Sequence, residues 1–160
     1  MRGGVLPSAM LCLALGLALA FVPLRVALRA ALLFLFVAIV VWAVSVPASL
    51  IEPVFVVLWI SVIATATTTF LPRPRAPAIA FMIAANAGLW TGAIVSIAGT
   101  GTDLARALPL VLAFAPGWWI VERGGAVGLK VGASWLIAIS TFAAMLPLIS
   151  TPGYVPDHME

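Results

Sequence analysis

Five polar side chains lie inside long apolar runs of this sequence, and they are its strongest candidates for chemistry. Ser61, Thr65 and Thr69 recur every four residues with Thr68 beside them, and Asn86 stands near the middle of AIAFMIAANAGLWTGAIVS. Residues four apart share one face of a helix, so the hydroxyl groups form a polar line. Inside a membrane, such groups either line a path for a solute or bond to a neighbouring helix. Both interpretations remain open, and the predicted partner of Asn86 is the line from Ser61 to Thr69.

The segment that carries Asn86 also has a stripe of small residues on another face. This small-residue stripe consists of Ala80, Ala84, Gly88, Gly92 and Ser96. Asn86 lies about 200° around a helix from Gly88 and shares a face with Met82 and Trp90. Small residues four apart let two helices approach closely in lipid. We therefore predict that this segment packs against neighbours on both sides.

Small residues at the same spacing mark two further segments as packing surfaces. They are Ser8, Cys12, Gly16 and Ala20 near the start, and Gly128 and Gly132 near the end. Cys12 is the only cysteine, so no internal disulfide can form, and we interpret it as a small packing residue rather than a reactive thiol. Segments 30–48 and 104–121, which are richer in Leu, Val and Phe, are predicted to face lipid.

Pro116 and Gly117 are predicted to interrupt the helix that contains them, because proline removes a backbone hydrogen bond. A broken helix is a common place for a transport site. Alternatively, this is a frayed helix end that the tryptophans at 118 and 119 anchor at the membrane surface.

The sequence offers no set of residues suited to catalysis. His158 is the only histidine, and with Asp157 and Glu160 it could hold a metal only with ligands from elsewhere. RGGAVGLKV has no Ser or Thr after its lysine, so it fails the phosphate-loop pattern, and GTGTDLARA lacks the GxGxxG spacing. We predict that the protein is not an enzyme, with no metal site and no cofactor.

The composition indicates a membrane protein. Hydrophobic residues make up 64% of the 160 residues and charged residues 8%, whereas a soluble domain has about 25% charged residues. The net charge of +3 is too small to suggest nucleic acid as a partner. We expect the partners to be the lipid bilayer and either other membrane subunits or further copies of the chain. The predicted fold is an all-α, polytopic membrane helix bundle over residues 1–160.

Charges and prolines divide the chain into six apolar runs, each near the roughly 20 residues that a membrane-spanning helix needs. The predicted spans are 5–22, 30–48, 53–71, 78–98, 104–121 and 126–149. The first run, MRGGVLPSAMLCLALGLALA, also resembles a signal peptide, and cleavage after Ala20 would leave five spans.

Basic residues concentrate in alternate connections. Six of the eight basic residues fall on one side of the predicted membrane: Arg25, Arg29, Arg73, Arg75, Arg123 and Lys130. Arg2 and Arg106 fall on the other side, with Glu52, Asp103, Asp157 and Glu160. Short loops rich in Lys and Arg stay in the cytoplasm, so we expect an inner (plasma) membrane protein with both termini outside the cytoplasm. No ionisable residue lies near the middle of a span, which argues against a proton relay within this chain.

LRVALRAALLFLF, followed by PASLIEPVFVVLWISVIATA, resembles the membrane half of fusaric-acid-resistance-type exporters over residues 24–70. That family shows an arginine-bearing entry into an apolar helix and then a helix that opens near a proline such as Pro53. The resemblance implies a six-helix module for efflux of aromatic or other amphipathic compounds. This chain departs from the family because it lacks a soluble cytoplasmic domain, so a partner would be needed.

We expect a transport or efflux module for a small amphipathic solute, acting as an oligomer or with partner subunits. The alternative is a non-catalytic accessory or assembly subunit of a larger membrane complex. Both functions require helices built to contact other helices.

Overall fold

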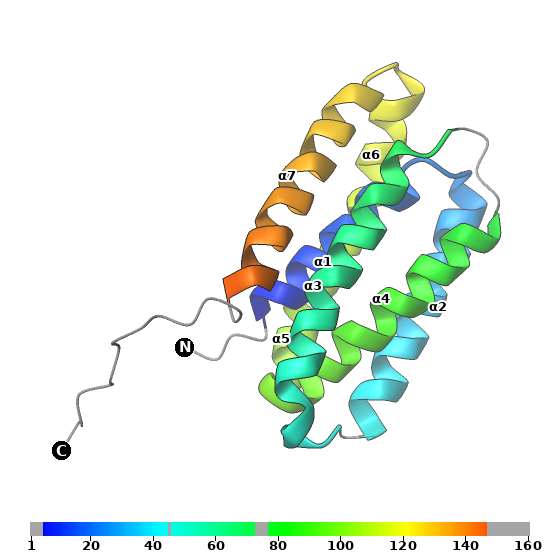
Figure 1. Ribbon diagram of the computed structural model, residues 1–160. Helices are drawn as coiled ribbons and strands as arrows, with labels where there is room; N and C mark the ends of the chain where they lie inside the picture. Colours follow the sequence, from blue (N-terminus) through cyan, green and yellow to red (C-terminus); the bar gives the residue numbers. More distant parts are fainter. Residues whose placement is uncertain (1–4, 45, 73–76, 147–160) are drawn as a thin grey trace.

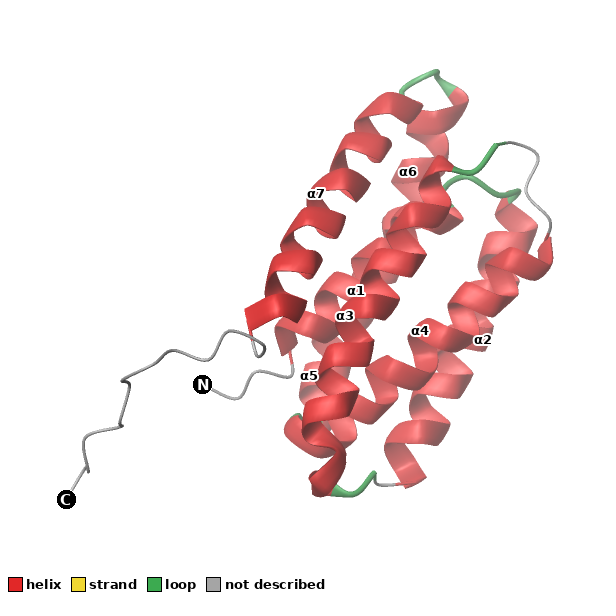
Figure 2. Ribbon diagram, viewed as in Figure 1, coloured by secondary structure: helices red, strands yellow, loops and turns green. Residues whose placement is uncertain are grey.

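The computed structural model describes residues 5–44, 46–72 and 77–146, which form helices joined by short turns (Figures 1 and 2). No strand occurs within these ranges, so the all-α prediction is confirmed. The α-helices are α1 (Val5–Leu19), α2 (Leu24–Val44), α3 (Ile51–Thr67), α4 (Pro77–Ala98), α5 (Gly101–Ala107), α6 (Phe114–Glu122) and α7 (Ala126–Met145). Three 3₁₀ segments extend or join them: η1 (Ala48–Leu50), η2 (Thr68–Phe70) and η3 (Leu108–Ala113).

Five of these units are long and apolar enough to cross a membrane. They are Leu24–Val44, Ala48–Phe70, Pro77–Ala98, Gly101–Glu122 and Ala126–Met145. They correspond to the second to sixth predicted spans, although residues 147–149 of the last span lie outside the described residues. The first predicted span is a shorter apolar helix, Leu6–Leu19. At 1.5 Å per residue, the 15 residues of α1 cover about 22 Å, less than a ~30 Å hydrocarbon core.

The short helix α1 runs through the centre of the bundle (Figure 1). It contacts α3 and α4 on one side and the α5–η3–α6 unit on another, and it touches α7. Leu11, Cys12, Leu15 and Leu19 are completely buried. The first run of the sequence therefore supplies the core, and its shortness costs little because other helices, not lipid, surround it.

The closest helix pair is α2 with α4, and the small-residue stripe of α4 makes that contact. A Cβ atom added at Gly88 would lie 2.6 Å from the carbonyl oxygen of Phe34, and one added at Gly92 would lie 2.5 Å from that of Ala38. Only glycine permits backbones to approach so closely. The neighbouring stripe residues Ala80 and Ala84 are also buried.

The opposite face of α4 is less covered than the sequence suggests. Met82, predicted to share a buried face with Asn86, is 71% exposed, and Leu89 is also exposed. Trp90 is half-buried and bonds along α4 to Asn86, which in turn bonds to Ser61 on α3. This side of α4 is therefore covered only in part.

α2, predicted to face lipid, and α7, predicted to pack through Gly128 and Gly132, are equally exposed in the bundle. In both helices 22% of the residues of the apolar stretch are buried, against 50% in α4. Gly128 has open space where a Cβ would be, and Gly132 would make only an ordinary 3.8 Å contact with Leu17. These two glycines therefore bring no described helix close to α7.

Four of the five described basic residues gather at one end of the bundle, where α1 joins α2 and α6 joins α7 (Figure 1). We call this the basic end; it carries Arg25, Arg29, Arg123 and Lys130. Arg73 and Arg75 lie outside the described residues. At the opposite end Arg106 forms an ion pair with Asp103 at 4.0 Å. Asp157 and Glu160 also lie outside the described residues.

Candidate functional site

Two of the polar side chains predicted to act together, Ser61 and Asn86, meet between α3 and α4. Asn86 Nδ2 donates a hydrogen bond to Ser61 Oγ. Asn86 Oδ1 accepts a hydrogen bond from the Trp90 indole N–H at 3.0 Å. Trp90 is one turn further along α4, so a single amide joins two helices and also bonds along its own helix. Both functional atoms of the Asn86 amide are therefore occupied by protein.

The threonines at the end of α3 bond to their own backbone. Thr68 Oγ1 donates to the carbonyl of Thr65, and Thr69 Oγ1 donates to that of Ala66, both at 2.7 Å. Such local bonds are typical of Thr where a helix changes geometry, as it does here on entering η2. These hydroxyl protons are therefore not offered to a solute or to another helix.

Other polar atoms are buried without a partner in the described part of the chain. Among them are Thr65 Oγ1 and Trp59 Nε1 on α3, and Ser140 Oγ on α7, which packs against α3. Ser61, Thr65 and Thr69 are all nearly or fully buried. The polar line of α3 therefore lies inside the protein, and among the described residues Asn86 is the group that connects it to α4.

The predicted helix break at Pro116 and Gly117 is wrong in position. α6 runs through both residues, from Phe114 to Glu122. The irregular segment is η3, one to two turns earlier, with Pro109 at its start. A proline ring clashes with the carbonyl four residues before it, so the disturbance from Pro116 falls at Leu112, inside η3. Pro116 itself occupies the first turn of α6, where a proline is tolerated.

Gly117 and Gly16 are packing residues of this same region. A Cβ at Gly117 would lie 2.8 Å from the Cβ of Ala20. A Cβ at Gly16 would lie 2.9 Å from the carbonyl oxygens of both Leu110 and Val111. Gly16 therefore allows α1 to contact the backbone of η3 directly, and this contact fixes the position of η3 relative to α1.

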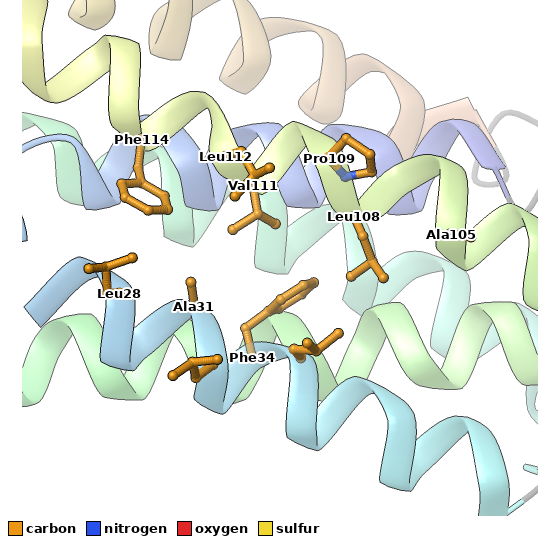
Figure 3. Close-up of a pocket in the computed structure, with 11 residues that line it drawn as sticks. Leu28, Ala31, Phe34, Ala105, Leu108, Pro109, Val111, Leu112 and Phe114 are labelled. Carbon is orange, nitrogen blue, oxygen red and sulfur yellow. The ribbon is translucent and has the colours of Figure 1, made fainter.

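A lateral groove of about 540 Å³ lies between α2 and the α5–η3–α6 unit (Figure 3). The residues that line it all have apolar side chains: Leu28, Ala31, Leu32, Phe34 and Leu35 from α2, and Ala105, Leu108, Pro109, Val111, Leu112 and Phe114 from the other wall. Figure 3 shows side chains from both walls directed into the space between them. Leu32 is 66% and Leu112 61% exposed, so the lips of the groove face outward, toward lipid in a membrane.

No direct sequence signal marks this groove, because the residues that line it are apolar side chains of the kind found throughout the chain. The one available hint was the pair of prolines at 109 and 116, which bracket the segment that forms one wall. The lateral groove contains none of the polar residues that the sequence singled out. Thr69 instead lines a smaller cavity of about 250 Å³ at the basic end, together with Lys130.

The candidate metal ligands His158, Asp157 and Glu160 lie outside the described residues. Within residues 5–44, 46–72 and 77–146, no three His, Cys, Asp or Glu side chains form a cluster. Cys12 is fully buried on α1.

Comparison with known proteins gives no relative: no family model, no curated protein and no solved structure matches the chain.

Proposed function

We propose that the protein is a transport module of the inner membrane that moves a small amphipathic solute through the lateral groove, acting as an oligomer or with partner subunits. The observation that carries this proposal is the groove itself, an apolar space of ligand size with an irregular helix as one wall. Binding pockets for small molecules typically measure about 300–1,000 Å³ and are lined mainly by apolar side chains.

An opening toward the side of the bundle suits a solute that dissolves in the bilayer first. The exposed lips at Leu32 and Leu112 leave no polar barrier between lipid and groove. An amphipathic compound partitions into the bilayer by burying apolar surface, and it can enter the groove without returning to water. The apolar lining then holds the body of the solute, while its polar end stays at the membrane surface.

The wall formed by η3 is the element best suited to move. A 3₁₀ stretch inside a longer helix has poorer hydrogen bonds than an α-helix and often marks a hinge. η3 joins α5 and α6 within one membrane-length unit, Gly101–Glu122. A change from 3₁₀ to α geometry there would shift Leu108 and Leu112 along the groove. Transport requires two such arrangements of the same wall.

The placement in the membrane follows from the charges. The basic end carries Arg25, Arg29, Arg123 and Lys130, and short basic connections remain in the cytoplasm. We therefore place the basic end at the cytoplasmic side of a cell inner membrane, with both termini outside the cytoplasm. The resemblance of residues 24–70 to aromatic-compound exporters favours the same solute class.

The alternative function, an accessory subunit of a larger membrane complex, is favoured by a different observation. The nitrogen and the oxygen of the Asn86 amide each bond within the protein, to Ser61 and Trp90, and Thr68 and Thr69 bond to their own backbone. This arrangement serves to join helices. In such a subunit, a helix of another chain would occupy the groove.

The test is transport by the purified protein in liposomes, with a set of aromatic amphipathic dyes, cationic and anionic, as probes. Ala31→Phe places a ring in the groove, and Ala43→Phe makes the same change on an exposed part of α2 outside it. We expect dye movement by the wild type and Ala43→Phe, and its loss in Ala31→Phe. If no dye moves, or if both variants behave alike, the groove is not a transport site. Extraction from the native membrane in a large complex of fixed stoichiometry would instead support the accessory function.

A further inference from the structure

We infer that the lateral groove binds an anionic phospholipid, with one acyl chain along the groove and the phosphate beside Arg25. This inference names the class of amphiphile for the proposed site, and so it rests on the assignment of the groove under the proposed function. It is carried by the match between an apolar groove and a positive charge at one of its ends.

The groove is suited to hydrocarbon and to nothing polar. All 11 residues that line it are Leu, Ala, Val, Phe or Pro (Figure 3). A polar group placed between Leu28 and Leu112 would lose its hydrogen bonds to water without gaining others, which costs several kcal/mol in hydrocarbon. The part of any ligand that lies in the groove must therefore be an alkyl chain or a similar apolar group.

The groove is also the right length and at the right depth for an acyl chain. From Leu28 to Leu35 it follows α2 for about 10 Å, at 1.5 Å per residue. That distance is about a third of a ~30 Å hydrocarbon core. Leu28 lies one turn after the start of α2 at Leu24, so the groove begins close to the basic end. A chain from the leaflet at the basic end fits this position.

Arg25 supplies the charge at the near end of the groove. It precedes Leu28 by three residues and Leu32 by seven, spacings that place all three on one side of α2. Arg25 is exposed, and within the described residues it forms no ion pair. Its guanidinium can extend past the end of the helix to the phosphate level, as arginine side chains do at membrane surfaces.

The two ends of the groove differ in charge, which sets the direction of the lipid. At the end near Ala105 the nearest charged residue is Arg106, whose charge is offset by Asp103. At the other end Phe114 is followed one turn later by Trp118, a residue type favoured at the headgroup level. A negatively charged headgroup is therefore favoured beside Arg25.

The experiment compares two lipids that differ only in headgroup charge. The purified full-length protein in mild detergent is mixed with phosphatidylglycerol or with phosphatidylcholine of identical acyl chains, and retained lipid is measured by native mass spectrometry. A basic residue near anionic lipid favours it by about fivefold. We expect the wild type to retain one phosphatidylglycerol with about that preference over phosphatidylcholine.

Four variants locate the binding. Arg25→Gln should bring the preference close to one, whereas Lys130→Gln, at the same end but away from the groove, should leave it unchanged. Ala31→Phe should remove the retained lipid of either type, whereas Ala43→Phe should not. Ala105→Phe fills the groove from the opposite wall and decides the result if Ala31→Phe does not fold.

Three results would overturn the inference. They are equal retention of the two lipids by the wild type, full retention by the folded groove-filling variants, or an equal loss of preference in Arg25→Gln and Lys130→Gln. The dye assay is independent of this one. Lipid selectivity without dye movement would sink the transport proposal alone, and dye movement blocked by Ala31→Phe without lipid selectivity would sink the lipid inference alone.

Discussion

Replacing Gly92 with alanine tests the closest helix contact of the bundle, that of α4 with α2. The new Cβ would lie 2.5 Å from the Ala38 carbonyl oxygen, 2.9 Å from the Val41 Cβ and 3.2 Å from the Trp42 backbone nitrogen. Two of these three atoms belong to the backbone of α2, so no side-chain rotation can relieve the overlap. α2 must move away from α4.

The size of the effect follows from that distance. Ordinary van der Waals contact of a Cβ atom begins at 3.4 Å, so the new Cβ at position 92 would lie about 0.9 Å too close to the Ala38 carbonyl oxygen. Overpacking of this kind typically costs about 1–3 kcal/mol. A gap of 0.5–1 Å elsewhere in the interface also forfeits a quarter to a half of the dispersion energy of the atoms that separate. Alanine regains up to about 1 kcal/mol because it favours the helix more than glycine does.

Gly132→Ala is the matched control for this helix-propensity term. It makes the same change inside α7, where the Cβ would meet only a leucine methyl group at 3.8 Å. The difference between the two variants therefore isolates the steric cost at position 92. We expect Gly92→Ala to have a free energy of unfolding about 1–3 kcal/mol below that of Gly132→Ala.

The assay is denaturant titration of the purified protein in mild detergent, followed by circular dichroism at a helix-sensitive wavelength. Both variants are compared with the wild type in the same preparation. If Gly92→Ala proves as stable as Gly132→Ala, then α2 and α4 are not in backbone contact, and the role assigned to the small-residue stripe is wrong.

Three further predictions use the same preparation. Asn86→Leu should lower the free energy of unfolding by about 0.6–1.7 kcal/mol, the range for hydrogen bonds between membrane helices; unchanged stability would show that the amide does not join α3 to α4. A cysteine at position 65 in a Cys12→Ala background should stay unreactive toward a charged thiol reagent until the protein is denatured, because Thr65 is fully buried. Rapid labelling in the native protein would reveal an aqueous path there. Gly16→Ala should destabilise the bundle relative to Gly132→Ala, since its Cβ would lie 2.9 Å from two carbonyl oxygens of η3; equal midpoints would contradict the close contact of α1 with η3.

The sequence was most informative where a single residue type has one physical meaning. Charges and prolines interrupt apolar runs, so the membrane-length units could be located within a few residues. Asn86 was expected to bond to the hydroxyl line of α3 because an unpaired amide is costly in hydrocarbon, and it bonds to Ser61.

The rest depended on which helices become neighbours, and apolar side chains carry little information about that. Gly92 and Gly132 look equivalent in the sequence, yet one touches the backbone of α2 and the other meets only a leucine tip. The position of the helix break was predicted wrongly because a proline disturbs the helical turn that precedes it. The irregular segment therefore lies at η3, before Pro116, and not at Pro116 itself. The lateral groove arises from the spacing between two apolar walls, which no residue pattern records.

The packing order of the helices has a consequence for biosynthesis. α1 makes little contact with α2, and α2 makes little with α3, whereas α4 packs on all three. During synthesis, α1 can therefore pair with α3 before α4 is made, but α2 has no large contact with either of them, and the chain has to be made as far as Ala98 before α2 can join the bundle. A ribosome paused ahead of α4 would leave α2 without its main packing partner. Destabilising substitutions in α4 should then cause membrane proteases to degrade the whole chain in cells. The amount of protein would fall before any change in activity could be measured.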